Sequence, residues 1–107
     1  MRYLMTSKAT DTAPNENLYV EMGKFIEELT AAGVLLATGG LAPDGVRVTS
    51  SGDEITVTDG PFTETKEAVA GFALVEVRSK EEAIELTRRF RAIVGDGESV
   101  IQQVFGP

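Results

Sequence analysis

The chain of 107 residues contains no cysteine, no histidine and no tryptophan. Without cysteine it cannot form disulfides, thiolate nucleophiles, iron–sulfur clusters or thiolate zinc sites. Without histidine it lacks the commonest general base near neutral pH and the commonest nitrogen ligand of metals, and the usual axial ligands of haem are missing as well. We therefore expect no metal, no haem and no other cofactor, and Ser-His and Cys-His catalysis are excluded.

Long apolar runs and an excess of positive charge are also missing. No stretch approaches the ~18 consecutive apolar residues of a membrane span, and residues 1–6 lack the apolar core and cleavage site of a signal peptide. The net charge of -7, from 17 acidic and 10 basic side chains, opposes binding to a phosphate backbone. We expect a cytoplasmic protein that binds neither membranes nor nucleic acid.

What is present is the composition of an ordinary globular domain. Apolar residues make up 42% of the chain, and its length is close to the commonest domain size. We find no linker, internal repeat or low-complexity tract. The sequence therefore predicts a single domain over residues 1–107.

The periodicity of apolar residues predicts two helices. The first begins after the N-cap Asn15 and ends before Gly33, and the second begins at Ser79 and ends before Gly95. Ser79 and Glu82 have the spacing of a capping box. The expected buried stripes are Leu18, Met22, Phe25, Ile26 and Leu29 in the first helix, and Ala83, Leu86, Phe90 and Val94 in the second.

Short apolar or alternating segments predict six strands around these helices. They cover residues 2–7, 34–37, 46–49, 55–58, 72–77 and 99–105. The third and fourth read as a hairpin, and residues 66–70 as a short helical turn. Gly39-Gly40 lacks the spacing of a dinucleotide fingerprint and is predicted to be a turn.

This order of elements predicts an α+β fold, a ferredoxin-like split βαβ with an inserted β-hairpin. Both helices can cover one face of an antiparallel sheet, which leaves the other face open. We expect strands carrying Leu35, Leu74, Val77 and Ile101 to be too apolar to face water. The simplest cover is a second copy of the chain, so we predict a homodimer with its sheets packed face to face.

The nine residues 59–67 form the most informative motif, Asp-Gly-Pro-Phe-Thr-Glu-Thr-Lys-Glu. An Asp-Gly pair favours a turn, and Pro61 fixes its own φ, so the backbone should hold the Asp59 carboxylate still. Phe62 supplies a large apolar side chain beside it. The motif predicts a rigidly presented acid next to an aromatic ring.

This motif, together with Gly40-Leu41-Ala42-Pro43 before it and Gly71-Phe72 after it, resembles the DGPF group of YCII-related proteins over essentially the whole chain. The resemblance implies a ferredoxin-like fold that forms a dimeric α+β barrel in bacteria. It also implies proximity to extracytoplasmic-function sigma factors, which some members are encoded beside or fused to.

The resemblance has a further implication for chemistry. A His-Asp active site has been proposed for the wider group, which includes a dehydrochlorinase of a chlorinated hydroxyquinol. Asp59 falls where the Asp of that proposal would be. Because this chain has no histidine, a histidine-dependent mechanism does not carry over.

Each candidate site residue has a structural alternative. Asp59 is our candidate catalytic residue, because a buried carboxylate beside Phe62 could act as a base; it could instead form a turn or cap a short helix. The candidate ligand-binding residues are Phe62, Thr65, Lys66 and Tyr19. Thr65 could instead be a helix cap, Lys66 an ion-pair partner of a carboxylate, and Tyr19 a half-buried amphipathic residue.

Two functions from different classes remain open on the sequence alone. In the first, a cytoplasmic dimer binds, and in one version transforms, a small organic molecule between helices and sheet beside Asp59. In the second, the chain is a non-enzymatic regulatory or interaction module whose acidic surface meets a protein partner such as a sigma factor. The sequence does not name a reaction for the first.

Overall fold

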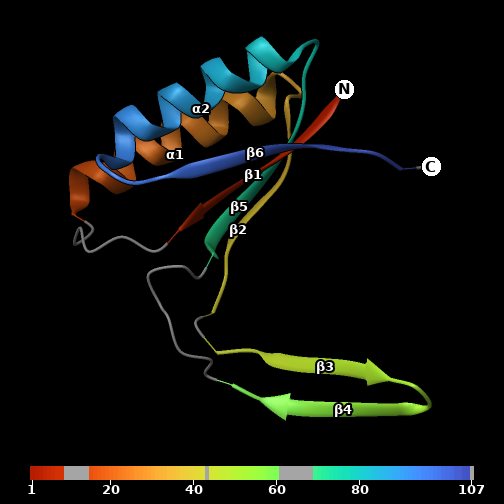
Figure 1. The fold of residues 1–107 in the computed structure, drawn as a ribbon. Helices are drawn as coiled ribbons and strands as arrows, with labels where there is room; N and C mark the ends of the chain where they lie inside the picture. Colours follow the sequence, from red (N-terminus) through yellow and green to blue (C-terminus); the bar gives the residue numbers. More distant parts are fainter. Residues whose placement is uncertain (9–14, 43, 61–68, 107) are drawn as a thin grey trace.

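The computed structural model describes the chain except for residues 9–14, 43, 61–68 and 107 (Figure 1). The described residues form two helices and six strands in the order predicted from the sequence. Their bounds are β1 Arg2–Lys8, α1 Glu16–Ala31, β2 Leu35–Gly40, β3 Val46–Ser51, β4 Glu54–Asp59, β5 Val69–Glu76, α2 Lys80–Val94 and β6 Ser99–Val104.

The main sheet has four antiparallel strands in the order β2-β5-β1-β6. Helices α1 and α2 lie side by side on one face of this sheet, and no helix of the described part of the chain covers the other face (Figure 1). Two α-β units joined through their central strands give the ferredoxin-like arrangement, with the β3-β4 hairpin inserted between β2 and β5. The predicted fold class is confirmed.

The helix ends are where the sequence predicts them. The Asn15 side chain accepts a hydrogen bond from the Leu18 N–H at 2.9 Å, and the Ser79 hydroxyl accepts one from the Glu82 N–H at 3.1 Å. Gly33, with φ of 74°, follows the last turn of α1, and Gly95, with φ of 86°, caps α2. Among the described residues, no helix is long and apolar enough to cross a membrane.

The core lies between the helices and the sheet. Its buried centre consists of Tyr3, Val75, Val77 and Ala83, with Val34, Leu35, Leu86 and Ile101 packed against it. This corrects one sequence argument, because Leu35, Val77 and Ile101 were expected to make the open face apolar. The pairing of Leu35 with Val75 and of Ile101 with Met5 puts both on the helix side, since opposed residues share a face.

The open face nevertheless carries apolar side chains, most of them not the predicted ones. Leu74 pairs with Leu4, and their alternation with the buried Tyr3, Ala73 and Val75 turns both away from the helices. Val100 and Val104 of β6 alternate with the helix-side Ile101 and are 43% and 39% exposed. Of the residues named from the sequence for this face, Leu74 alone is on it.

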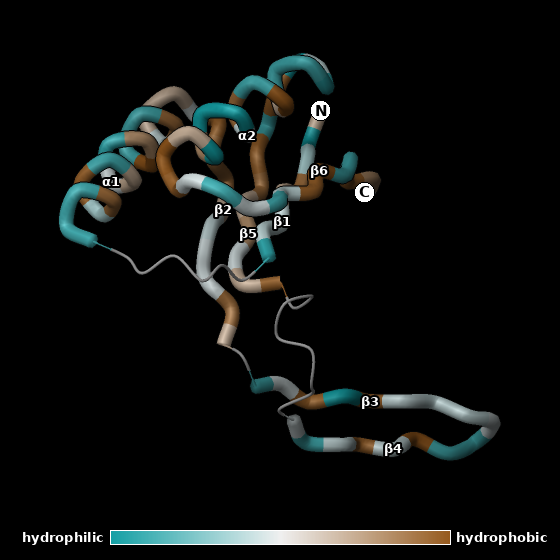
Figure 2. Tube along the Cα trace, turned by 60° about the vertical axis from the view of Figure 1, so that its left-hand side comes forward, coloured by the Kyte–Doolittle hydropathy of each residue, from teal (hydrophilic) through white to brown (hydrophobic). Residues whose placement is uncertain are grey.

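The hairpin stands away from the two-layer body, and its strands pair with each other in a separate two-stranded sheet (Figures 1 and 2). Val46, Val48, Ile55 and Val57 share one face, because Val48 pairs with Val57 and the others alternate from them. All four side chains are between 60% and 68% exposed. The opposite face carries Arg47, Thr49, Glu54, Thr56 and Thr58.

Two local predictions need correction. Gly39 and Gly40 are not a turn but the last two residues of β2, paired with Phe72 and Gly71 of β5. The expected helical turn over residues 66–70 lies mostly outside the described residues, and Val69 and Ala70 belong to β5. In both places the pairing of neighbouring strands overrides the local preference of the residues.

Candidate ligand-binding cavity

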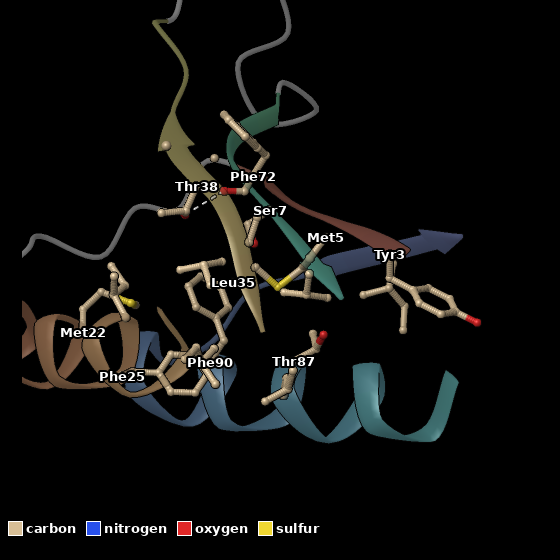
Figure 3. Close-up of a pocket in the computed structure, with 18 of the residues that line it drawn as sticks. Tyr3, Met5, Ser7, Met22, Phe25, Leu35, Thr38, Phe72, Thr87 and Phe90 are labelled. Atoms are coloured by element: carbon tan, nitrogen blue, oxygen red, sulfur yellow. Dashed lines mark hydrogen bonds between the residues drawn. The ribbon is translucent and has the colours of Figure 1, made fainter. Parts of the chain in front are cut away.

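A cavity of about 420 Å³ lies between the two helices and the sheet. All four strands of the main sheet and both helices contribute to its wall, and Figure 3 shows labelled residues from the sheet and from the helices on its two sides. The sheet residues are Tyr3, Met5, Ser7, Leu35, Thr38, Gly39, Gly40, Gly71, Phe72, Ala73, Val75 and Ile101. The helix residues are Met22, Phe25, Ile26, Leu29, Ala83, Leu86, Thr87, Phe90 and Val94.

The floor of the cavity follows from the strand register, which arranges its residues in rows across the sheet. One row is Gly40, Gly71, Ser7 and Ser99, the next is Thr38, Ala73, Met5 and Ile101, and the third begins with Leu35, Val75 and Tyr3. Side chains therefore become smaller and more polar from the third row to the first. The space opens where the floor consists of glycine and alanine.

Glycine is unfavourable inside strands, and one reason to find it there is close approach by another group. A Cβ added at Gly39 would come within 3.2 Å of the Phe72 ring, and one at Gly71 within 3.4 Å of the Gly39 carbonyl oxygen. Thr38, Gly39 and Gly40 are exposed although they line the cavity. The cavity thus opens to solvent at the end of β2.

The roof of the cavity is built by the apolar stripes of the helices, as predicted from their periodicity. Phe25 of α1 and Phe90 of α2 both belong to this roof (Figure 3). Arg89 of α2 joins the two helices: its guanidinium lies 4.8 Å from the centre of the Phe25 ring and donates hydrogen bonds of 2.7 and 2.8 Å to the two carboxylate oxygens of Glu28.

The contact between Glu28 and Arg89 shifts the pKa of both groups. The hydrogen bonds from Arg89, followed by its positive charge, hold the pKa of Glu28 below its ordinary value, and the same contact raises the pKa of Arg89. Both side chains are about half exposed, so the pair is screened by solvent. We interpret it as an orienting contact between the helices, while the apolar roof supplies most of the packing.

Few polar groups reach the interior. Thr38 Oγ1 donates to the Phe72 carbonyl at 2.9 Å, and Thr87 Oγ1 donates to the Ala83 carbonyl at 2.8 Å, so both hydroxyl protons are engaged. Ser7, 8% exposed, is the buried polar residue of the described chain. Of the lining residues, none carries a charged side chain.

The structure places two of the residues proposed from the sequence, Asp59 and Tyr19, away from this cavity. Asp59 ends β4, where it pairs with Val46, and is exposed. Tyr19 lies on α1 and is 66% exposed. Among the described residues, neither contributes to the cavity wall. Phe62, Thr65 and Lys66 lie outside the described residues.

The functional signal that sequence reasoning missed is the glycine pattern. Gly39, Gly40 and Gly71 fall inside two neighbouring strands, and Ala73 continues the small-residue floor on β5. The run of Gly39-Gly40 before the hairpin and the Gly71 of the central strand were both visible in the chain. Reading them as strand glycines would have indicated a space above the sheet.

No group of three or more acidic residues that could hold a metal ion occurs in the described part of the chain. Asp53, Glu54 and Asp59 are close in sequence but belong to the exposed hairpin region. Alternation along β4 directs Glu54 and Asp59 to opposite faces of the hairpin. The site is therefore a shaped apolar cavity.

The protein is therefore a two-layer α+β protein with a cavity between its helices and its sheet. The sequence profile of the YCII-related domain matches residues 1–102. The chain belongs to the YCII-related family. A relative from Rhizobium meliloti (strain 1021), an uncharacterised protein, is 36% identical over 84 residues, which are 77% of this chain and 64% of that protein. The chain thus spans less than two thirds of the length of this curated relative.

A solved structure shares the fold. It is 5-chloro-2-hydroxyhydroquinone dehydrochlorinase (TftG) from Burkholderia phenoliruptrix AC1100, in complex with 2,5-dihydroxybenzoquinone. The similarity has a TM-score of 0.53 and covers 100% of this chain and 96% of that chain, at 15% sequence identity. At this identity the likeness establishes a common fold.

The Glu28–Arg89 pair predicts a specific pH dependence of stability. Because the folded-state pKa of Glu28 is depressed, the contribution of the pair is present above the ordinary glutamate pKa of about 4.3 and is lost as the pH falls through the lower folded value. We expect Glu28→Gln to lower the melting temperature at neutral pH, and the wild type and the variant to converge at about pH 3.

Thermal unfolding followed by circular dichroism between neutral and acidic pH measures this convergence. Glu27→Gln, at the neighbouring exposed position of α1, is the matched control, because it removes the same charge one residue away from the pair. A difference between wild type and Glu28→Gln that stayed constant down to pH 3 would contradict the interpretation.

Proposed function

We propose that this protein binds a small, uncharged, mostly apolar ring compound in the cavity between its helices and its sheet. The observation that carries the proposal is the cavity itself, whose volume of about 420 Å³ lies within the usual range for ligand sites, about 300–1,000 Å³. Its wall combines many apolar side chains with a few hydroxyl groups. This is the composition typical of sites for small organic molecules.

The lining determines what charge a ligand can carry. A carboxylate or ammonium group would lose its hydration in the cavity and meet no countercharge among the described lining residues. A neutral ring loses little hydration and gains contacts with Phe25, Phe90 and Met22. The composition of the wall therefore favours a neutral ligand over an ionic one.

The volume determines the size of the ligand. An apolar cavity of about 150 Å³ accommodates one benzene molecule. A cavity of about 420 Å³ therefore has room for two or three fused rings with substituents. The solved relative TftG, which was crystallised with the ring compound 2,5-dihydroxybenzoquinone, supports a cyclic ligand in this fold.

We also propose that the protein is a cytoplasmic homodimer. An isolated two-stranded hairpin is marginally stable in water, yet β3 and β4 expose an apolar stripe of Val46, Val48, Ile55 and Val57. The open sheet face also carries exposed apolar side chains. A second copy has the same two surfaces, so the packing of two copies would cover both surfaces at once. The cytoplasmic location expected from the sequence stays a prediction.

The exposed hairpin also favours the second candidate function, an interaction module that meets another protein. Asp59 lies at the open end of the hairpin, where the Gly60 N–H donates to the Gly45 carbonyl at 2.6 Å. Asp59 stays our candidate catalytic acid. Phe62, Thr65, Lys66 and Tyr19 stay candidate ligand contacts, which would require a bound molecule or a second copy to lie against them.

The cavity proposal predicts that an apolar bicyclic probe binds. We expect tetralin (tetrahydronaphthalene) to bind with a dissociation constant on the order of 0.1 mM, from a ligand efficiency of about 0.5 kcal/mol per heavy atom. Ala73→Leu should weaken binding at least tenfold, because the larger side chain fills the floor of the cavity. Titration of methyl resonances in NMR spectra measures both affinities.

The control for this substitution is Ala92→Leu, which adds the same atoms at an exposed position of α2. Failure of tetralin to shift any methyl resonance of the wild type would overturn the proposal.

The candidate acid is tested by the same titration of Asp59→Asn and of the wild type with a hydroxylated probe, tetralol. An unchanged affinity of the variant for tetralol would remove Asp59 from the ligand site.

The dimer proposal predicts a face-specific effect on the hairpin. Sedimentation velocity at micromolar concentration should show a dimer for the wild type and a monomer for Val48→Lys, because a charge would enter the apolar stripe. Thr49→Lys, one residue along and on the polar face, should remain a dimer. A monomeric wild type would contradict the proposal and favour a different protein as the occupant of this surface.

A further inference from the structure

We infer that the cavity has one hydrogen-bond-donating pole, the Ser7 hydroxyl, and that it selects ring compounds carrying an acceptor oxygen such as a ketone. This inference rests on the proposed binding function and specifies the ligand. It comes from a chain of polar groups that connects the surface of α2 with the interior of the cavity. The chain consists of Arg91, Ser99 and Ser7.

The geometry of this chain gives it a direction. Arg91 Nη1 donates to Ser99 Oγ at 3.2 Å, and Ser99 Oγ lies 2.9 Å from Ser7 Oγ. A guanidinium group has donors and no acceptor, so Ser99 must accept from it. A hydroxyl that accepts from a cation becomes a stronger donor, which favours donation from Ser99 to Ser7. The proton of Ser7 is then directed to a group inside the cavity.

The other hydroxyls of the cavity cannot take this role. Thr38 and Thr87 have both donated their protons to backbone carbonyls, of Phe72 and Ala83, and present lone pairs. Figure 3 shows the Tyr3 hydroxyl pointing away from the labelled residues around Phe25 and Phe90. Among the described lining residues, Ser7 is therefore the hydroxyl available to donate.

The position of Ser7 suits a ligand that enters at the cavity mouth. Ser7 stands in the same cross-strand row as Gly71 and Gly40, and Gly40 is exposed at the mouth. The two glycines leave the backbone bare between solvent and Ser7. A flat ring can lie over them with its oxygen against the Ser7 hydroxyl and its apolar edge against the helices.

The protein holds Arg91 in place by several contacts. Arg91 Nη2 donates to the Gly95 carbonyl at 2.7 Å, and its guanidinium lies 5.6 Å from the centre of the Phe90 ring. A Cβ at Gly97 would collide with Arg91 Nη2, so the glycine leaves room for the guanidinium. No ion pair of Arg91 with a carboxylate occurs among the described residues. Its charge is left to polarise the serines.

The test compares two probes that differ by one oxygen, tetralin and its ketone α-tetralone. Wild-type protein should bind α-tetralone about tenfold more tightly than tetralin, the gain expected from a hydrogen bond from a polarised donor. Ser7→Ala should remove this preference, so that the variant binds the two probes with equal affinity. Ser7→Thr retains a hydroxyl and should restore it. Methyl NMR titration of each variant gives the affinities.

Arg91 is inferred to act through Ser99, so it is a positioning residue, and its test needs a readout that packing alone would not move. The infrared carbonyl stretch of bound α-tetralone should lie at lower frequency in the wild type than in Ser7→Ala. Arg91→Gln and Gly97→Ala should both raise this frequency toward the Ser7→Ala value. Arg88→Gln, a neighbouring surface arginine paired with Glu85, is the control and should not.

The possible results separate the two proposals. Equal affinities of the wild type for tetralin and α-tetralone would overturn the donor pole while leaving the cavity a binding site. A preference that persisted in Ser7→Ala would likewise overturn it. Binding of neither probe would overturn the proposed function itself, and the donor pole with it.

Discussion

Small residues on the neighbouring strands β2 and β5 face large ones on the helices, and the cavity between them results from this difference in size. Gly40, Gly71 and Ala73 form the floor, while Phe25 and Phe90 form part of the roof. The space of about 420 Å³ opens to solvent, so without an occupant its apolar lining stays in contact with water, which is unfavourable. An apolar occupant would remove this contact, and this supports our interpretation of the cavity as a binding site.

The unfavourable exposure of apolar surface to water also bears on the open sheet face and the hairpin. Two helices cover one face of the sheet, and the described chain offers nothing to cover the other face or the valine-rich side of the hairpin. In a monomer, the side chains of Val46, Val48, Ile55 and Val57 would form an apolar stripe in contact with water, and such stripes usually mark interaction surfaces. The cavity and the open face lie on opposite sides of the main sheet, so a second copy packed on the open face would leave the cavity mouth at Gly40 outside that contact.

Much of the fold could be predicted from the sequence, because local patterns agreed with the final packing. The caps at Asn15 and Ser79, the helix stripes and the hairpin alternation each depend on near neighbours in the chain. Which strand face a residue occupies depends on pairing with distant strands, so Leu35, Val77 and Ile101 were assigned to the wrong side. The candidate site was harder, since the cavity arises from what glycine and alanine leave unfilled. The conspicuous Asp59 drew attention to the hairpin, whereas Ser7 carries no motif.

The central claim is that an apolar, solvent-accessible space exists between the helices and the sheet. Methyl NMR spectra recorded under xenon pressure test it directly, because xenon enters apolar cavities. We predict that xenon shifts the methyl resonances of Met5, Met22 and Ile101, which line the cavity. The methyl resonances of Val104, on the open sheet face, should shift much less. Shifts that were absent, or no larger at the lining residues than at Val104, would contradict it.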